Sequence, residues 1–151
     1  IKKAGQISYK DKKYITSNMK SSNFETYQVV QISYKSDDKK LILLDICGIV
    51  DKDYQKCLKE IKSIEKDFEL MFPNTKKFDL QTYSHWQDKS GESKISDIIW
   101  KFDNGDVIVL ACYNWNTAFG KKNRYNDELR IAIGSKEFDS FLIIGKSDAT
   151  W

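Results

Sequence analysis

The segment from residue 53 to residue 72 constrains the fold more than any other part of this 151-residue chain. Its apolar side chains recur in steps of three and four, which places them on one stripe of an α-helix; they are Tyr54, Cys57, Leu58, Ile61, Ile64, Phe68, Met71 and Phe72. Charged residues such as Lys59 and Glu60 lie off this stripe. Asp51 is the expected N-cap, and Pro73 is expected to end the helix. The pattern therefore predicts a helix over about 53–72 that lays one face on a sheet.

Strand patterns lie on both sides of this segment. The runs that alternate between apolar and polar residues, or that are rich in β-branched and aromatic ones, are 27–35, 41–46, 78–86, 95–102, 106–115 and 129–133. Such runs are typical of β-strands. The run 41–46 is apolar at nearly every position, which predicts an interior strand covered on both faces. Asn104-Gly105 between two later runs predicts a type I′ hairpin turn, because both central residues of that turn need a positive φ.

A short repeat marks the N-terminal region. The residues Gln-Ile-Ser-Tyr-Lys occupy 6–10 and recur letter for letter at 31–35. An Asp- and Lys-rich turn and a second apolar pair follow each copy. Two copies are fewer than a stacked repeat array needs, so we expect two similar hairpins rather than a solenoid.

These elements predict one α+β domain over residues 1–151. Its core would be an antiparallel sheet of five or more strands packed against the helix at about 53–72. A single proline and seven glycines leave no linker that would divide the chain. A short C-terminal helix is expected after Ser135, which would cap it; its apolar residues would be Phe138, Phe141 and Leu142.

The charge balance disfavours a nucleic-acid partner. The chain has 25 Lys and Arg against 22 Asp and Glu, a net charge of +3, and its only arginines are Arg124 and Arg130. Lysine is a strongly hydrated surface charge, whereas the forked guanidinium of arginine is the usual reader of phosphates and bases. No apolar run approaches the roughly 18 residues that a membrane span requires. The composition therefore predicts a soluble domain without a membrane span.

Three cysteines leave the redox state open. A disulfide from Cys47 to either Cys57 or Cys112 would suit an oxidising compartment, and three buried thiols would suit the cytosol. The first residue is Ile1 rather than Met. We take this as favouring export, so a secreted or periplasmic location is expected.

Signatures of catalysis are sparse in this sequence. His85 is the only histidine, so it would have to be the base for any cysteine nucleophile. The cysteines do not show the paired spacing of a zinc site, and no phosphate-binding loop, nucleophile elbow or dinucleotide fingerprint occurs. Asp97 and Glu92 were considered as a glycosidase-like pair, but scattered carboxylates are usually solvated partners of lysine. We therefore assign no catalytic residue, metal site or cofactor.

Two aromatic loops give a better candidate site, at 83–92 and 114–127. Because successive strands of a meander reverse direction, these loops are expected to meet at one end of the sheet. Their rings, amides and arginine are the groups that recur at binding hot spots; the candidate residues are His85, Trp86, Trp115, Asn116, Arg124 and Tyr125. The structural alternative is that Trp86 and Trp115 merely cover the edge of the sheet.

The sequence thus predicts a non-catalytic binding module with a protein or carbohydrate partner. One alternative is a small hydrolase or transferase with a cysteine nucleophile and His85 as base. A further alternative is single-stranded nucleic-acid binding, with lysines along the backbone and aromatic rings stacked on bases.

Overall fold

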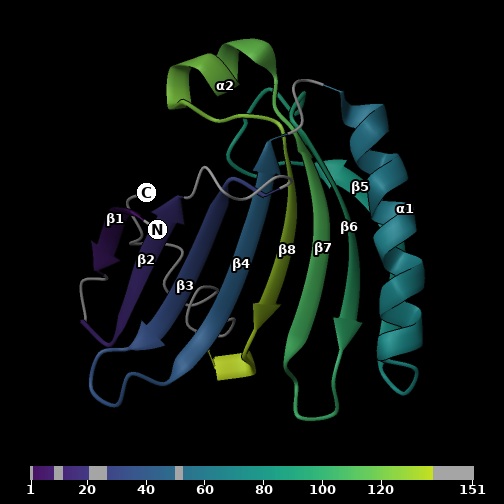
Figure 1. Cartoon of the computed structure of the whole chain (residues 1–151). Coiled ribbons are helices and arrows are strands. Elements are labelled where there is room, and N and C mark those ends of the chain that lie inside the picture. The colour runs from purple at the N-terminus through teal and green to yellow at the C-terminus, as the bar shows by residue number, and fades with distance from the viewer. Residues whose placement is uncertain (1, 9–11, 21–26, 50–52, 138–151) are drawn as a thin grey trace.

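The computed structural model of the chain describes residues 2–8, 12–20, 27–49 and 53–137. Eight antiparallel strands form one sheet in the order β1-β2-β3-β4-β8-β7-β6-β5 (Figure 1). In chain order the elements are β1 (Lys2–Ser8), β2 (Tyr14–Lys20), β3 (Val29–Lys35), β4 (Leu41–Ile49), α1 (Tyr54–Met71), β5 (Lys76–Ser84), β6 (Lys94–Lys101), β7 (Val107–Asn114), α2 (Thr117–Asn123) and β8 (Glu128–Gly134). The predicted α+β class is therefore confirmed.

The path of the chain explains why α1 lies where it does. The helix carries the chain from β4, in the middle of the sheet, to β5 at the far edge (Figure 1). The strands β5, β6 and β7 then return as the predicted meander, and β8 closes the gap between β7 and β4. The described part of the first copy, residues 6–8, lies in β1, which pairs with β2, and the second copy, 31–35, lies in β3, which pairs with β4, so the chain has the two predicted hairpins.

The helix has the predicted length, but a different residue caps its start. The side chain of Asp53 accepts a hydrogen bond from the backbone N–H of Lys56 at 2.9 Å, which makes Asp53 the N-cap. The prediction of Asp51 was wrong in this respect, and Asp51 itself lies outside the described residues. At the other end the backbone N–H of Phe72 still donates to Phe68, and Pro73 follows as predicted.

The apolar stripe of α1 packs on the sheet and forms the hydrophobic core. Cys57 and Ile61 are fully buried against residues of β6, β7 and β8. Cys57 also lies at disulfide-bonding distance from Cys112 of β7. The expectation that Cys47 would pair with one of them was wrong, because Cys47 is a free, buried thiol on β4. The sequence could not choose among the pairs, since the choice depends on which strand the helix crosses.

Strand β4 is interior, since it pairs with β3 on one side and β8 on the other. The prediction that its run 41–46 is covered on both faces is only partly right. Ile42 and Asp45 are buried, whereas Leu41 is 54% exposed at the start of the strand. Asp45 is the unexpected residue of this run, because its carboxylate is buried inside an otherwise apolar strand.

The turn between β6 and β7 differs from the predicted type I′ turn. Only Gly105 has a positive φ, of 89°, so Asn104 does not adopt the left-handed conformation that a type I′ turn requires. Instead, Phe102 and Asp106 close a three-residue loop, in which the N–H of Phe102 donates to Asp106 at 2.9 Å. The side chain of Asn104 accepts from the N–H of Asp106 and so stabilises the loop.

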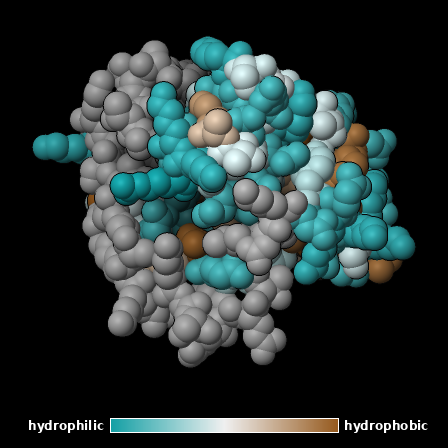
Figure 2. Space-filling model, turned by 90° about the horizontal axis from the view of Figure 1, so that it is seen from above, coloured by the Kyte–Doolittle hydropathy of each residue, from teal (hydrophilic) through white to brown (hydrophobic). Residues whose placement is uncertain are grey.

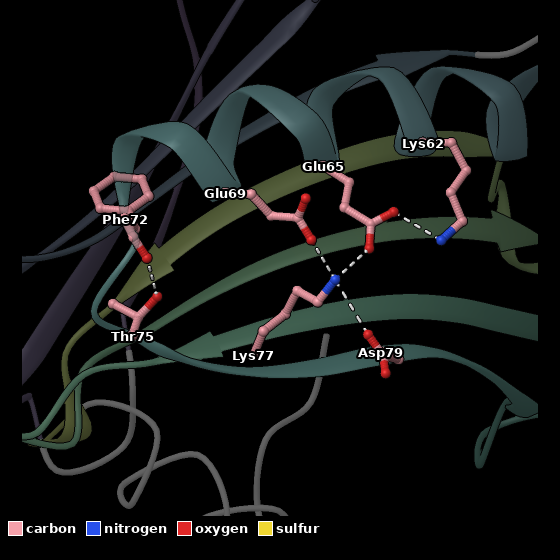
Figure 3. Close-up of polar contacts among 7 residues, drawn as sticks. All are labelled: Lys62, Glu65, Glu69, Phe72, Thr75, Lys77 and Asp79. Carbon is pink, nitrogen blue, oxygen red and sulfur yellow. Dashed lines mark hydrogen bonds and ion pairs between the residues drawn. The ribbon is translucent and has the colours of Figure 1, made fainter.

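An ion-pair network ties the edge strand β5 to α1 (Figure 3). The ammonium of Lys77 lies 2.9 Å from Glu65 and 3.2 Å from Asp79, and it also pairs with Glu69. Glu65 is buried and receives a second ion pair from Lys62 at 2.7 Å. Burial alone would raise the pKa of Glu65, but the hydrogen bonds from Lys62 and Lys77 lower it overall. The network therefore holds a buried carboxylate in its charged form.

Two expectations about short helices have different outcomes. The segment 114–127 was interpreted as a loop, but it contains α2, whose seven residues are too few to show an apolar periodicity. The residues expected to form the C-terminal helix after Ser135, namely Phe138, Phe141 and Leu142, lie outside the described residues. In the described part of the chain, neither helix has the length and apolar character needed to cross a bilayer.

Candidate functional site

The two aromatic loops meet at one end of the sheet. His85 follows β5 and Trp115 follows β7, and their ring centroids lie 4.3 Å apart. Trp86 stacks on His85 at 5.4 Å, and Tyr125 lies 4.5 Å from Trp115. The structure therefore brings His85, Trp86, Trp115 and Tyr125, which were predicted from the sequence, into one chain of ring contacts.

Two further rings extend this chain. Phe119 of α2 stacks on Trp115 at 5.8 Å, and Tyr113 of β7 lies 6.0 Å from both Trp115 and His85. We call the set the aromatic cluster; its members are His85, Trp86, Tyr113, Trp115, Phe119 and Tyr125. Sequence reasoning placed Phe119 in the correct loop without assigning it to the site. It missed Tyr113 because a tyrosine inside a predicted strand is already explained by the preference of aromatic residues for β-strands.

Buried polar side chains hold the two loops in place. The carboxylate of Asp127 accepts a hydrogen bond from the backbone N–H of Trp115 at 2.7 Å. The hydroxyl of Ser93 accepts from the N–H of Asn116 at 2.9 Å and donates to Asp88 at 2.6 Å. Hydrogen bonds from Ser93 and Ser90 lower the pKa of Asp88 to about 2. These contacts join the loop before β6 to the loop after β7, so the rings are held by a defined backbone.

Asn116 and Arg124, also predicted as site residues, have other positions. The side-chain oxygen of Asn116 accepts from the backbone N–H groups of Ala118 and Phe119 at 3.0 Å, which makes it the N-cap of α2. Its amide nitrogen donates to Glu92. Arg124 is the C-cap of α2 in the left-handed conformation, and it is exposed. The structure does not bring either side chain into the aromatic cluster.

The rings of the aromatic cluster differ in their access to solvent. Trp86 is 54% exposed, whereas His85 is only 6% exposed and fills the space behind it. Burial lowers the pKa of His85, and the positive charge of Arg130 lowers it further, against a smaller opposing effect of Asp88, so the neutral imidazole is favoured. Trp115 lies half-buried between the other rings. The structural alternative, that aromatic residues cover the edge of the sheet, therefore fits His85 and Trp115 better than Trp86.

Strand register places a second, polar group on the face opposite α1. Cys112 faces the helix, because it is bonded to Cys57. Side chains alternate along a strand, so the neighbouring Tyr113 faces the opposite side, which we call the open face. Directly paired residues share a face. Glu128, which pairs with Tyr113, and the adjacent open-face residue Arg130 therefore lie on the open face of β8.

On this face a guanidinium lies between two carboxylates. Arg130 contacts Glu128 through Nη2 at 2.9 Å and Asp45 of β4 through Nε at 3.4 Å. Its guanidinium carbon lies 5.0 Å from the ring centre of Tyr113, in cation–π geometry. We call Asp45, Tyr113, Glu128 and Arg130 the Arg130 cluster. Sequence reasoning missed it, although a lone aspartate inside the apolar run of β4 was the available signal.

Burial dominates the electrostatics of this cluster. It raises the pKa values of Asp45 and Glu128, although the charge of Arg130 acts in the opposite direction. Burial also raises the pKa of the Cys47 thiol to about 12, and that sulfur lies 3.5 Å from a carboxylate oxygen of Asp45. A thiol with such a pKa is almost entirely protonated at pH 7 and is a poor nucleophile.

The two acids considered as a glycosidase-like pair have separate partners. Asp97 is buried and accepts a hydrogen bond from the hydroxyl of Tyr83, while Glu92 accepts from the amide of Asn116. Burial raises the pKa of Asp97. Within the described ranges, no group of three or more His, Cys, Asp and Glu side chains is placed to hold a metal ion.

Comparison with protein-family models, with curated proteins and with solved structures finds no match to this chain.

Proposed function

We propose that this chain is a non-catalytic binding module that contacts its partner, a protein or a carbohydrate, through the aromatic cluster. The observation that carries the proposal is the meeting of two loops, which follow β5 and β7 at the same end of the sheet, in one continuous set of rings. Tryptophan and tyrosine provide large contact areas at a low cost in conformational entropy, which is why they dominate binding hot spots. Hydrogen bonds that the carboxylates of Asp88 and Asp127 accept from Ser93 and Trp115 hold the loops in advance of binding.

Catalysis by cysteine is less well supported. Cys57 and Cys112 are joined to each other, and burial raises the pKa of the remaining thiol, Cys47, to about 12. His85 stacks against tryptophan rings, and its Nδ1 accepts a hydrogen bond from the backbone of Gln87. Neither half of a thiolate–imidazole pair is therefore prepared for reaction.

Nucleic-acid binding is also less well supported. Arg130, the cation that contacts the ring of Tyr113, is already paired with Asp45 and Glu128. A phosphate group would have to compete with two carboxylates for it, which electrostatics disfavours. The disulfide between Cys57 and Cys112 supports a secreted or periplasmic location for the module, since disulfides persist in oxidising compartments.

The test uses Trp86, because its exposed side chain can be removed with little loss of packing. Binding of the chain to a panel of polysaccharides, and to proteins that it captures, is compared for the wild type and Trp86→Ala. We expect at least about a tenfold loss of affinity, because truncating a hot-spot aromatic residue costs about 2 kcal/mol or more. Trp115→Ala is a poorer test, since that ring lies between its neighbours and its loss would also lower stability.

Phe78→Ala is the matched control. Phe78 is 38% exposed on β5, so the substitution removes an accessible aromatic ring outside the aromatic cluster. It is expected to leave affinity unchanged. The proposal fails if Trp86→Ala binds every identified partner as tightly as the wild type, or if Phe78→Ala weakens binding by as much.

A further inference from the structure

The aromatic cluster and the Arg130 cluster share a residue. The ring of Tyr113 lies 6.0 Å from Trp115 and 6.0 Å from His85 on one side, and 5.0 Å from the guanidinium carbon of Arg130 on the other. The two clusters therefore form one strip, which runs from the loops onto the open face of the sheet. One part of the strip offers flat rings, and the other offers charged hydrogen-bonding groups.

The charged part of the strip is only partly accessible to solvent. The side chain of Arg130 is 33% exposed and that of Glu128 is 21% exposed, whereas the side chain of Asp45 is 4% exposed. Asp45 thus lies within the sheet at ion-pair distance from the buried Nε, without a hydrogen bond to it, whereas the side chains of Arg130 and Glu128 reach solvent in part. A guanidinium carries five N–H donors, more than its two carboxylate contacts engage. The strip therefore presents oriented donors and acceptors beside aromatic rings.

The surface at the end of the molecule where α2 lies disfavours a hydrophobic protein interface. Seen from the end of the molecule where α2 lies, the described surface is mainly hydrophilic, and its few hydrophobic residues are separated from one another (Figure 2). The centre of a protein interface is usually depleted of charged residues, whereas charged residues make up one whole part of this strip. Aromatic rings beside a few oriented polar groups are typical of small-ligand sites. In sugar recognition the rings pack against the C–H faces of a pyranose, and the polar groups bind its hydroxyls.

The charges in the strip narrow the class of sugar. The Arg130 cluster contains one more negative than positive group, because Arg130 lies between Asp45 and Glu128. The carboxylate of an acidic sugar would be placed against these two acids, one buried and one part-exposed, at an electrostatic cost. We propose that the aromatic cluster and the Arg130 cluster form one binding surface for neutral carbohydrate. This inference rests on the proposed binding function and names its ligand class.

The experiment measures affinity for soluble neutral glycans (mannan, glycogen, xyloglucan and chitooligosaccharides) and for acidic ones (polygalacturonate and hyaluronan), by affinity electrophoresis and calorimetry. At least one neutral glycan is expected to bind, and the acidic ones are not. Arg130→Met is expected to weaken this binding at least about tenfold, because it removes charge-assisted hydrogen bonds. Glu128→Gln keeps the shape of the side chain and is expected to weaken binding several-fold.

Glu69→Gln is the matched control for Glu128→Gln, because it makes the same substitution in the ion-pair network of α1 and β5. It is expected to leave glycan affinity unchanged. If Arg130→Met does not fold, Arg130→Lys and Glu128→Gln decide the outcome, with thermal unfolding as the check on folding. Binding of the acidic glycans in preference to the neutral ones would overturn the inference, as would binding of none.

Two results separate this inference from the proposed function. If Trp86→Ala abolishes binding and the Arg130 and Glu128 variants do not alter it, the binding function stands and the Arg130 cluster has no part in it. If no glycan binds but a captured protein depends on Trp86, the ligand class proposed here is wrong and the binding function again stands. Loss of glycan binding in all three variants supports both.

Discussion

The two faces of the sheet are built from the same strands but differ in chemistry. On the face under α1, Ile98, Leu110 and Leu129 form an apolar core with the helix. On the open face, one residue further along from Leu129, the part-exposed Arg130 pairs with the buried Asp45. Burial of apolar groups stabilises a fold, whereas a buried ion pair contributes little to stability or opposes it. The comparison therefore assigns stability to the covered face, and recognition is what we propose for the open face.

The largest expected effect concerns the covered face. The substitution of both Cys57 and Cys112 by alanine removes a cross-link between residues 55 apart in the sequence, which joins α1 to β7. The entropy gained by the unfolded chain corresponds to a loss of about 4 kcal/mol in the free energy of unfolding. Urea denaturation at pH 7 measures this loss.

Cys47→Ala is the control for removal of a buried sulfur. Cys47 carries no cross-link, so its substitution is expected to cost about 1 kcal/mol, the scale of a small loss of packing. Glycan affinity is expected to be unchanged in the double variant, because the disulfide faces away from the strip. Reduced affinity in a still-folded double variant would contradict the division between the faces.

The open face is expected to give a smaller loss of stability that depends on pH. Arg130→Met leaves Asp45 and Glu128 without their cation, and the free energy of unfolding at pH 7 should fall by about 2–3 kcal/mol. Burial raises the folded-state pKa values of both acids above their unfolded values, and loss of Arg130 raises them further. Such groups stabilise the fold below their unfolded pKa, and this stability is lost as pH rises through the folded pKa.

The variant should therefore recover stability when the pH is lowered from 7.5 to 5, as measured by urea denaturation. Arg130→Lys keeps the positive charge, so its loss in the free energy of unfolding should be smaller and should depend less on pH. If Arg130→Met loses the same free energy of unfolding at both pH values, the two carboxylates do not depend on Arg130 for their charge.

The covered face was largely predictable because it follows from local patterns. The stripe of α1 shows the face that is buried, and alternation along β6 and β7 shows which residues meet it. The meeting of the aromatic loops was also predictable, because His85 and Trp115 each follow the last residue of a strand and these two strands run in the same direction. A meander places every second strand end at the same edge, whatever the detailed geometry.

The open face was not predictable, because it depends on pairings between distant strands. Asp45 meets Arg130 only because β8 inserts between β4 and β7, and no local signal gives that order. The disulfide depends in the same way on where the helix crosses the sheet. Local ambiguity explains the other differences: Asp51 and Asp53 are both reasonable N-caps, and the pattern around Gly105 fits two kinds of turn.

The smallest expected effect tests charge at the rim of the covered face. Lys77→Met removes the contacts of Lys77 with Glu65, Glu69 and Asp79 (Figure 3), and Glu65 is buried. Lys77 is 26% exposed, so its ion pairs are partly screened, and we expect a loss of about 1–2 kcal/mol in the free energy of unfolding at pH 7. Thermal unfolding measures this loss, and Lys62→Met, at a 53% exposed position with one partner, should cost less.

The pH dependence of this network should have the opposite sign to that of the Arg130 cluster. Although burial acts to raise the pKa of Glu65, the hydrogen bonds from Lys62 and Lys77 lower it overall. The stability it contributes is therefore present above the unfolded pKa and is lost as pH falls through the folded pKa. The difference between Lys77→Met and the wild type should shrink toward pH 3, and glycan affinity at pH 7 should be unchanged. A Lys77 variant that weakened glycan binding would show that charges on both faces serve recognition, and the comparison would fail.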